Sequence, residues 1–258
     1  MLFDSHAHIN DLKLIDRIEE IIDNALKNEI NKIVCVGYDK ESSLNAIELA
    51  NQYDIIYAAI GVHPSEANQF NMDIDWIKDY IDNPKVVAIG EIGLDYYWDK
   101  TYKEEQKELF KKQIELANQY KKPFIVHMRD ATNDTYELIK STKNNDISGV
   151  MHCYSASKES MQQFIDLGMY ISLAGPVTFK NAKTPKEVAK EIPLDKLLVE
   201  TDCPYLAPTP FRGKVNEPKN VLYIAKEIAK IKDISFEELS KHTYKNTCKL
   251  FNIEMKEE

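Results

Sequence analysis

The feature that most constrains the fold is a repeated alternation between short apolar runs and amphipathic stretches, which recurs about eight times along the chain. Several apolar runs are continuous rather than alternating, as in residues 33–36 and 86–89. Continuous runs of this kind are typical of parallel strands that are covered on both faces. The sequence therefore predicts eight strands, at Leu2–His6, Lys32–Gly37, Ile55–Val62, Val86–Ile92, Pro123–Met128, Gly149–Tyr154, Met169–Ala174 and Leu197–Thr201.

The amphipathic stretches predict helices between these strands and after the last one. Their expected ranges are Leu14–Asn28, Ser42–Gln52, Asp75–Ile81, Lys103–Tyr120, Ala131–Thr142, Lys158–Leu167, Pro185–Ile192, Pro218–Ile231 and Ser235–Phe251. Eight strand–helix units in a chain of 258 residues match an α/β fold, a parallel (β/α)8 TIM barrel. We expect one domain over residues 1–258, with extra C-terminal helices. A doubly wound open sheet is the alternative, but no glycine-rich fingerprint supports it.

The charge balance argues against a general nucleic-acid binder. The chain has 33 lysines and arginines against 42 aspartates and glutamates, which gives a net charge of −9. Affinity for nucleic acid normally rests on basic surface. Any binding of a polyanion by this chain therefore has to depend on positive charge concentrated at one place.

The cysteines and the first residues indicate the compartment. The four cysteines are far apart and include no CxxC pair, which is typical of reduced thiols in the cytoplasm. The chain enters an apolar run at once, without the basic n-region of a secretory signal. No stretch approaches the ~18 apolar residues that cross a bilayer. We therefore expect a cytoplasmic protein with no membrane association and no obligate protein partner.

Most of the histidines lie where a barrel keeps its active site. Five of the six stand at or just beyond the end of a predicted strand, and they are His6, His8, His63, His127 and His152. Active sites of (β/α)8 barrels lie at the carboxyl ends of the strands. Because strand side chains alternate between faces, the pair at positions 6 and 8 points the same way. Taken alone, such a pair is equally compatible with two ordinary core or surface histidines.

Two carboxylates stand at equivalent places, Glu91 after the fourth apolar run and Asp202 after the eighth. A buried carboxylate requires a partner, and a metal ion is a natural one. Four imidazoles and two carboxylates exceed the complement of a mononuclear zinc site. They suit two divalent ions roughly 3.5–4 Å apart that share a carboxylate and a hydroxide. The predicted ligands are His6, His8, Glu91, His127, His152 and Asp202, with Glu91 as the bridge.

Six short motifs carry a resemblance to a known family. They are Asp4-Ser5-His6-Ala7-His8, Gly61-Val62-His63-Pro64, Gly90-Glu91-Ile92-Gly93-Leu94-Asp95-Tyr96, His127-Met128-Arg129-Asp130-Ala131, Met151-His152-Cys153-Tyr154-Ser155 and Glu200-Thr201-Asp202-Cys203-Pro204-Tyr205-Leu206. In this order and spacing the chain resembles the TatD-type metal-dependent deoxyribonucleases, which are amidohydrolase-like barrels. The resemblance runs from residue 4 to about residue 250. It implies the same six metal ligands.

The resemblance also implies roles in substrate binding and catalysis. His63 corresponds to a histidine that binds the substrate phosphate or acts as acid or base, and Asp202 would take a proton from the attacking water. Arg129 and Arg212 stand where a guanidinium could hold a phosphate. For Arg212 a solvated loop charge is an equal alternative. Cys153 and Cys203 follow predicted ligands, and they either influence metal choice or are simply small packed side chains.

These features predict a metal-dependent hydrolase that cleaves phosphodiester bonds of DNA. Two divalent ions would make the barrel mouth electropositive although the chain is acidic, which favours exonuclease action on single-stranded ends. The expected polarity of digestion is 3′ to 5′. The ligand set admits Zn, Mg, Mn, Ni or Co. Hydrolysis of another ester or amide, such as a lactone or a D-aminoacyl-tRNA ester, is the alternative, because a fold does not fix its chemistry. A non-catalytic metal-binding protein is disfavoured because every ligand position is filled.

Overall fold

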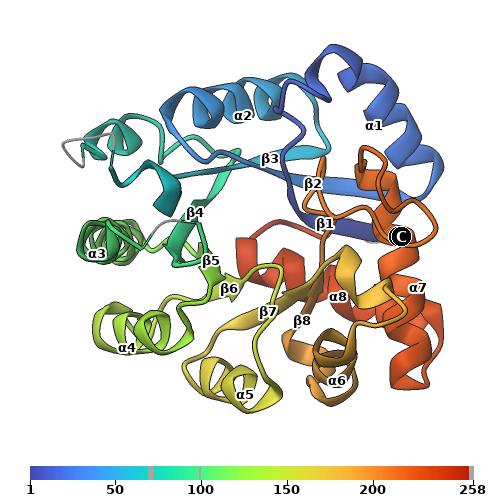
Figure 1. Ribbon diagram of the computed structural model, residues 1–258. Helices are drawn as coiled ribbons and strands as arrows, with labels where there is room; N and C mark the ends of the chain where they lie inside the picture. Colours follow the sequence, from blue (N-terminus) through green and yellow to red (C-terminus); the bar gives the residue numbers. More distant parts are fainter. Residues whose placement is uncertain (69–72, 99, 256–258) are drawn as a thin grey trace.

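The computed structural model describes residues 1–68, 73–98 and 100–255. Eight parallel strands form one sheet in the order β1 to β8, and helices surround them (Figure 1). The strands are β1 (Leu2–Ala7), β2 (Ile30–Val36), β3 (Ile56–Ile60), β4 (Val86–Asp95), β5 (Phe124–Arg129), β6 (Gly149–Met151), β7 (Tyr170–Leu173) and β8 (Leu197–Val199). The predicted (β/α)8 barrel is confirmed.

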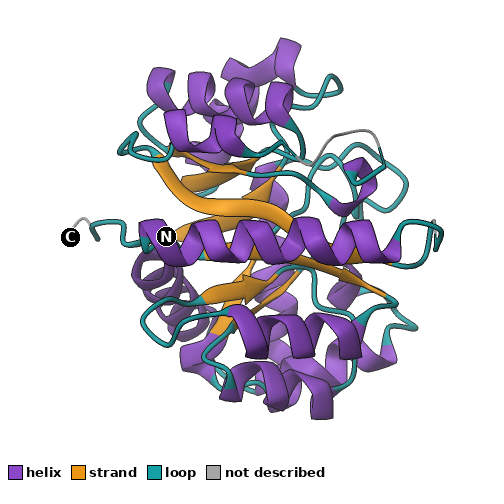
Figure 2. Ribbon diagram, turned by 90° about the vertical axis from the view of Figure 1, so that its left-hand side faces the viewer, coloured by secondary structure: helices purple, strands orange, loops and turns teal. Residues whose placement is uncertain are grey.

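The helices follow the strands and cover the outside of the barrel, as the side view in Figure 2 shows. They are α1 (Ile18–Lys27), α2 (Lys40–Gln52), α3 (Lys103–Tyr120), α4 (Thr132–Thr142), α5 (Lys158–Asp166), α6 (Lys183–Glu191), α7 (Val221–Lys232) and α8 (Phe236–Phe251). The last two are the predicted extra C-terminal helices. In the described part of the chain, none of the helices has both the length and the apolar character needed to cross a membrane.

The third strand–helix unit differs from the prediction. The sequence predicts a helix at Asp75–Ile81, but the structure forms a short 3-10 helix at Asp75–Asp79. Within the described residues between β3 and β4, another 3-10 helix spans Pro64–Glu66, and no α-helix is present. The apolar pattern identified a buried face correctly, since Trp76 and Ile77 are buried. The segment is short, and an isolated helical turn gains too few hydrogen bonds to offset the cost of its nucleation.

Two apolar clusters hold the barrel together. The larger one joins the outward faces of the strands to the surrounding helices. The smaller one takes one or two side chains from every strand, such as Phe3, Ala59 and Leu198, and adds residues of the C-terminal segment that include Tyr244 and Phe251. Helix α8 therefore completes the apolar core of the barrel interior, which fills its space with side chains as in other barrels of this kind.

The seam between the first and last strands brings distant parts of the sequence together. The Asp202 N–H donates to the carbonyl of His6 at 3.0 Å, and the His8 N–H donates to the carbonyl of Cys203 at 2.7 Å. At the same seam, the buried carboxylate of Asp4 accepts hydrogen bonds from the N–H and hydroxyl of Thr201. These contacts fix the end of β1 against the segment that follows β8.

Candidate metal centre

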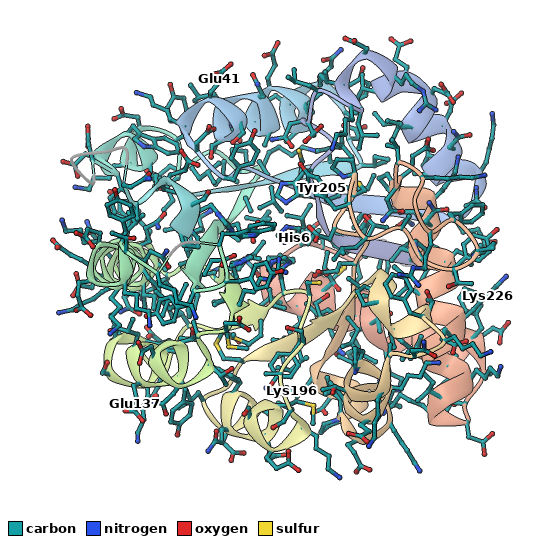
Figure 3. All side chains as sticks on the ribbon, viewed as in Figure 1. His6, Glu41, Glu137, Lys196, Tyr205 and Lys226 are labelled. Atoms are coloured by element: carbon teal, nitrogen blue, oxygen red, sulfur yellow. The ribbon has the colours of Figure 1, made fainter. Side chains whose placement is uncertain are left out.

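A cavity of about 940 Å³ opens at the carboxyl ends of the strands. Its wall includes five of the six predicted ligands, which are His8, Glu91, His127, His152 and Asp202. The sixth, His6, is fully buried directly behind them. In Figure 3, His6 lies in the middle of the barrel, whereas Glu41 and Glu137 lie at the periphery. The side chains singled out in the sequence thus lie together, and their role as ligands stays a prediction.

Glu91 lies between two pairs of imidazoles. It stands within β4, which continues to Asp95, beyond the predicted end at Ile92. Its Oε2 atom lies 3.4 Å from His6 Nε2 and 3.5 Å from His8 Nε2. Its Oε1 atom lies 2.8 Å from both His127 Nδ1 and His152 Nε2. The two oxygens of one carboxylate therefore face two different sets of nitrogen donors.

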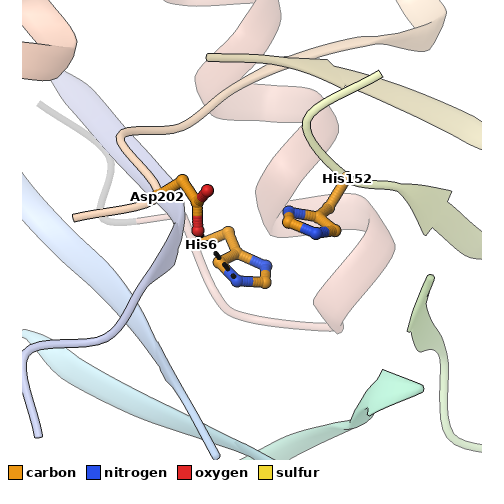
Figure 4. A group of neighbouring side chains, drawn as sticks. All are labelled: His6, His152 and Asp202. Carbon is orange, nitrogen blue, oxygen red and sulfur yellow. Dashed lines mark ion pairs between the residues drawn. The ribbon is translucent and has the colours of Figure 1, made fainter. Parts of the chain in front are cut away.

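The Asp202 carboxylate lies beside the first of these sets. Its Oδ1 atom lies 3.7 Å from His6 Nε2 and 3.6 Å from His8 Nε2. The residue has a positive φ of 54°, a conformation that is uncommon outside glycine and often marks functional sites. Figure 4 shows the Asp202 carboxylate directed at His6, with the His152 ring alongside. The His6 and His152 rings are stacked, with their centroids 4.0 Å apart.

Three overlapping groups of side chains have donor atoms close enough to share a metal ion. They are His6–His152–Asp202, His6–His8–Glu91 and His63–Glu91–His127. The third group includes a histidine that the sequence assigned to substrate. His63 Nε2 lies 3.6 Å from Glu91 Oε1, and its Nδ1 accepts a hydrogen bond from the Ser65 N–H. His63 is therefore placed either to contact substrate or to act as a further ligand.

The donor set fits divalent ions because most of the imidazoles are already oriented by a second acceptor. His8 Nδ1 lies 2.9 Å from the Val36 carbonyl oxygen, leaving Nε2 to face Glu91. His127 Nε2 lies 2.9 Å from Asp95 Oδ2, leaving Nδ1 to face Glu91. Metal-ligating histidines typically donate their other ring N–H to a carboxylate or a backbone carbonyl. Each of these rings thus directs its other nitrogen toward Glu91, on the side where an ion would sit.

His152 is oriented in the same way by a buried carboxylate. Its Nδ1 lies 3.1 Å from Glu200 Oε1, which also accepts the Cys153 N–H at 2.8 Å. Sequence reasoning assigned no role to Glu200 or Asp95, although both stood in the quoted motifs. One signal was available for each: Glu200 follows an apolar run two residues before Asp202, and Asp95 follows Glu91 within one apolar strand.

The electrostatics of the metal-free site are those of an acidic group surrounded by bases. Burial acts to raise the pKa of Glu91, but the imidazoles of His152 and His63 outweigh it and hold that pKa well below its usual range. Burial acts to lower the pKa of His152, but Glu91 and Glu200 raise it well above its ordinary value. Hydrogen bonds to Asp95 and Glu91 likewise outweigh burial and raise the pKa of His127. Protons therefore balance the buried negative charge that divalent ions would otherwise balance.

The pKa values of the remaining imidazoles shift in different directions. For His8, Glu91 and Asp202 outweigh burial and raise the pKa. For His6, burial and the nearby charge of His152 lower it. Burial and repulsion by His127 lower the pKa of His63 to about 3, so this ring is neutral at neutral pH.

One glycine is required for strands β4 and β5 to lie close together beside the site. Gly93 has a φ of 144°, and a Cβ there would lie 2.0 Å from the carbonyl oxygen of His127. Only glycine lets β4 approach β5 so closely at this height.

The structure separates the two arginines that were expected near substrate. Arg129 ends β5, is exposed and lines the cavity, with its guanidinium 3.8 Å from the ring centroid of Tyr97. Arg212 packs its guanidinium over the Phe179 ring at 4.1 Å. Among the described residues, it is not one of those that line the cavity. Arg129 is thus brought to the site and Arg212 is not.

The two cysteines beside predicted ligands differ in place. Cys153 lines the cavity, and Cys203 is fully buried. Burial raises the pKa of both thiols well above the usual value, and for Cys153 the charge of Asp202 adds to this effect. Both side chains are therefore neutral thiols in the metal-free protein.

Comparison with known families agrees with this geometry. A family model described as "TatD related DNase" matches residues 3–252. The chain belongs to the TatD family. The match covers nearly the whole chain, including all eight strands except Leu2 at the start of β1, and every side chain of the site.

Relatives within the TatD family span the chain from end to end. An uncharacterized metal-dependent hydrolase, YabD of Bacillus subtilis (strain 168), is 48% identical over 254 residues, covering 98% of this chain and 100% of that protein. The uncharacterized metal-dependent hydrolase YcfH of Escherichia coli (strain K12) is 37% identical, with 98% and 96% covered. The crystal structure of YJJV, a TatD homologue from Escherichia coli K12, superimposes with a TM-score of 0.93 at 27% identity, covering 98% of each chain.

Proposed function

We propose that this chain is a metal-dependent hydrolase that cleaves phosphodiester bonds of DNA, removing nucleotides from the 3′ ends of single strands. Its metal dependence is supported by the names of its relatives, and its action on DNA by the description of its family. Two divalent ions would be held by His6, His8, Glu91, His127, His152 and Asp202.

The two-ion proposal rests on the position of the Glu91 carboxylate between two pairs of imidazoles. One of its oxygens faces His6 and His8, and the other faces His127 and His152. A single ion would use one of these sets and leave the other as a buried cluster of imidazoles. Divalent ions in such a site make a water molecule nucleophilic near neutral pH and offset the charge of a phosphate.

Asp202 is suited to accept a proton from that water. In the metal-free protein, burial raises its pKa even though the imidazoles of His152 and His6 oppose the change. A carboxylate beside a metal-bound water can accept the proton that this water releases. Its position beside His6 and His8 places it within the site rather than at the rim.

His63 is suited to donate a hydrogen bond to the phosphate. The Ser65 N–H donates to His63 Nδ1 at 3.1 Å, so in the neutral ring the proton is on Nε2. Nε2 is the atom that faces the Glu91 side of the cavity. At the rim, the exposed guanidinium of Arg129 would neutralise a non-bridging oxygen.

Action on strand ends is supported by size and charge. A cavity of about 940 Å³ takes a short part of a strand rather than a wrapped duplex. The net charge of −9 also disfavours broad contact with a polyanion outside the metal site.

The test is digestion of a 5′-labelled single-stranded oligonucleotide with EDTA, with add-back of Mg, Mn or Zn, and with the Glu91→Ala variant. Glu41→Ala is the matched control, because Glu41 is exposed on α2. We expect a ladder that shortens from the 3′ end, is lost with EDTA and Glu91→Ala, and persists with Glu41→Ala. A protein that holds two ions by elemental analysis but cleaves no oligonucleotide contradicts the proposal and directs attention to carboxylic esters and amides.

A further inference from the structure

Two large aromatic side chains are exposed beside the cavity. Trp98 has 77% of its surface exposed and Tyr97 has 52%. Their ring centroids are 4.9 Å apart, and the rings are nearly perpendicular. Tryptophan is highly buried on average, so an adjoining pair of exposed rings is an informative departure from the usual pattern.

Arg129 extends this pair into one continuous surface. Its guanidinium lies 3.8 Å from the Tyr97 ring centroid and 5.4 Å from that of Trp98. Trp98 and Arg129 both line the cavity that contains Glu91. The three side chains, called here the aromatic platform, therefore stand at the rim of the candidate metal centre.

Asp95 holds the platform in a fixed relation to that centre. Its Oδ1 accepts hydrogen bonds from the N–H of Tyr97 at 2.9 Å and the N–H of Trp98 at 3.3 Å. Its Oδ2 lies 2.9 Å from His127 Nε2. One buried carboxylate thus positions both a predicted metal ligand and the backbone that carries the exposed rings.

We propose that the aromatic platform stacks an unpaired base of the strand whose phosphate lies at the metal centre. This inference rests on the proposed function and names the part of the substrate that is recognised. Every base has a π-face, so stacking on an exposed aromatic ring recognises single strands without regard to sequence. Bases in a duplex are stacked on one another, and the platform therefore selects for single-stranded ends. Arg129 adds a cation beside the ring and next to the phosphate backbone.

A second aromatic at the rim is a poorer candidate. Tyr205 lines the cavity and is 48% exposed. Its hydroxyl donates to Asp11, and Lys13 lies over its ring at 4.7 Å. The cation over the Tyr205 ring is closer than the Arg129 guanidinium is to the Trp98 ring, at 5.4 Å, and Trp98 is more exposed, at 77%. Trp98 therefore offers the larger accessible ring surface.

The first experiment compares two substrates with two proteins. Wild-type protein and Trp98→Ala are assayed on a single-stranded oligonucleotide and on one with abasic residues throughout its 3′ segment. We expect Trp98→Ala to lower kcat/KM about tenfold to a hundredfold on the first substrate. On the abasic substrate the two proteins should be equally slow. Trp98→Phe should restore most of the loss, and Tyr223→Ala, an exposed aromatic on α7, should have no effect.

The second experiment uses the fluorescence of Trp98 to detect binding of a base to the aromatic platform. The chain has two tryptophans, and Trp76 is buried, so Trp76→Phe leaves Trp98 as the single tryptophan, whose emission is excited selectively over that of tyrosine. Titration with a labelled phosphorothioate oligonucleotide should change Trp98 emission in step with the anisotropy of the label. Binding without a change in emission, or equal loss of activity on both substrates in Trp98→Ala, contradicts base stacking on the platform but not the proposed nuclease activity. A wild-type protein that neither binds nor cuts any oligonucleotide overturns both.

Discussion

The carboxylate of Asp95 lies 2.9 Å from His127 Nε2, on the side of the ring that faces away from Glu91. Burial acts to raise the pKa of Asp95, but the hydrogen bond and charge of His127 outweigh it and keep that pKa low. An ionised acceptor at this place keeps the imidazole proton on Nε2. His127 Nδ1, which faces Glu91, is then free to bind a metal ion.

Asp95→Asn is therefore expected to weaken metal binding. The amide can still accept the Tyr97 N–H, but a nitrogen facing His127 would favour the tautomer with its proton on Nδ1. We expect metal affinity to fall about 10- to 100-fold, as is typical when the partner of a ligating histidine is changed. Competition titration with a chelator measures this. Asp23→Asn, at an exposed carboxylate on α1, should keep wild-type affinity, and an Asp95→Asn protein that does so too would refute the role.

Metal removal is expected to destabilise the fold. An ion that binds only the folded chain stabilises it by about 2.7 kcal/mol at a free concentration of about 100 times Kd. For a chain of this size the change corresponds to a shift in Tm of roughly 5–10 °C. Thermal unfolding with EDTA and with Zn, Mn or Mg measures the shift. Glu91→Ala should lose most of it, and Glu41→Ala should keep it. A metal-independent Tm in the wild-type protein would contradict the binding set.

The fold could be predicted from the sequence because the strands of this barrel are covered on both faces. Runs such as residues 33–36 and 86–89 are short and apolar throughout, and their regular recurrence between amphipathic stretches identifies parallel strands. The convergence of His6 and Asp202 also followed from topology, since the first and last strands of a closed barrel are neighbours. The expected helix at Asp75–Ile81 failed because a pattern of buried residues does not distinguish a short 3-10 turn from an α-helix.

Other features depend on contacts that no local pattern contains. Asp95 orients His127 through a hydrogen bond between the neighbouring strands β4 and β5, and Glu200, just after β8, orients His152, just after β6. Their carboxylates follow apolar residues just as the predicted ligands do. Residue type alone therefore could not show that these two carboxylates orient a histidine rather than bind a metal ion. The separation of Arg212 from the cavity likewise depends on a long loop, whose path is set by tertiary packing rather than by its residues.

The contribution of α8 to the barrel interior predicts a large effect of truncating Phe251. This side chain is 2% exposed and belongs to the cluster that fills the barrel interior. Phe251→Ala should lower the free energy of unfolding by about 3–5 kcal/mol, the usual cost of a cavity of this size. Urea denaturation measures the change. Leu12→Ala, at a side chain that is 89% exposed, should cost less than about 0.5 kcal/mol. Similar losses in both variants would show that α8 does not complete the core.

The burial of the Asp4 carboxyl predicts that its contribution to the free energy of unfolding declines as pH rises. Burial raises the pKa of Asp4 to about 8, although hydrogen bonds from Thr201 act to lower it. The usual value is 3.8, so between these values the unfolded chain releases a proton that the folded chain keeps. The contribution is therefore fully present below about pH 4 and is lost as pH rises through about 8, by at most about 1.4 kcal/mol per pH unit.

Asp4→Asn removes this titration. In the metal-free protein, the free energy of unfolding of wild type minus that of Asp4→Asn should decrease from about pH 4 to about pH 8 and then become constant. Chemical denaturation across this range in EDTA measures the difference. Asp23→Asn serves as the control, because its carboxylate is exposed and its difference from wild type should show no such decline. A wild-type minus Asp4→Asn difference that stays constant, or that grows with pH, would mean that Asp4 is already ionised in the folded chain.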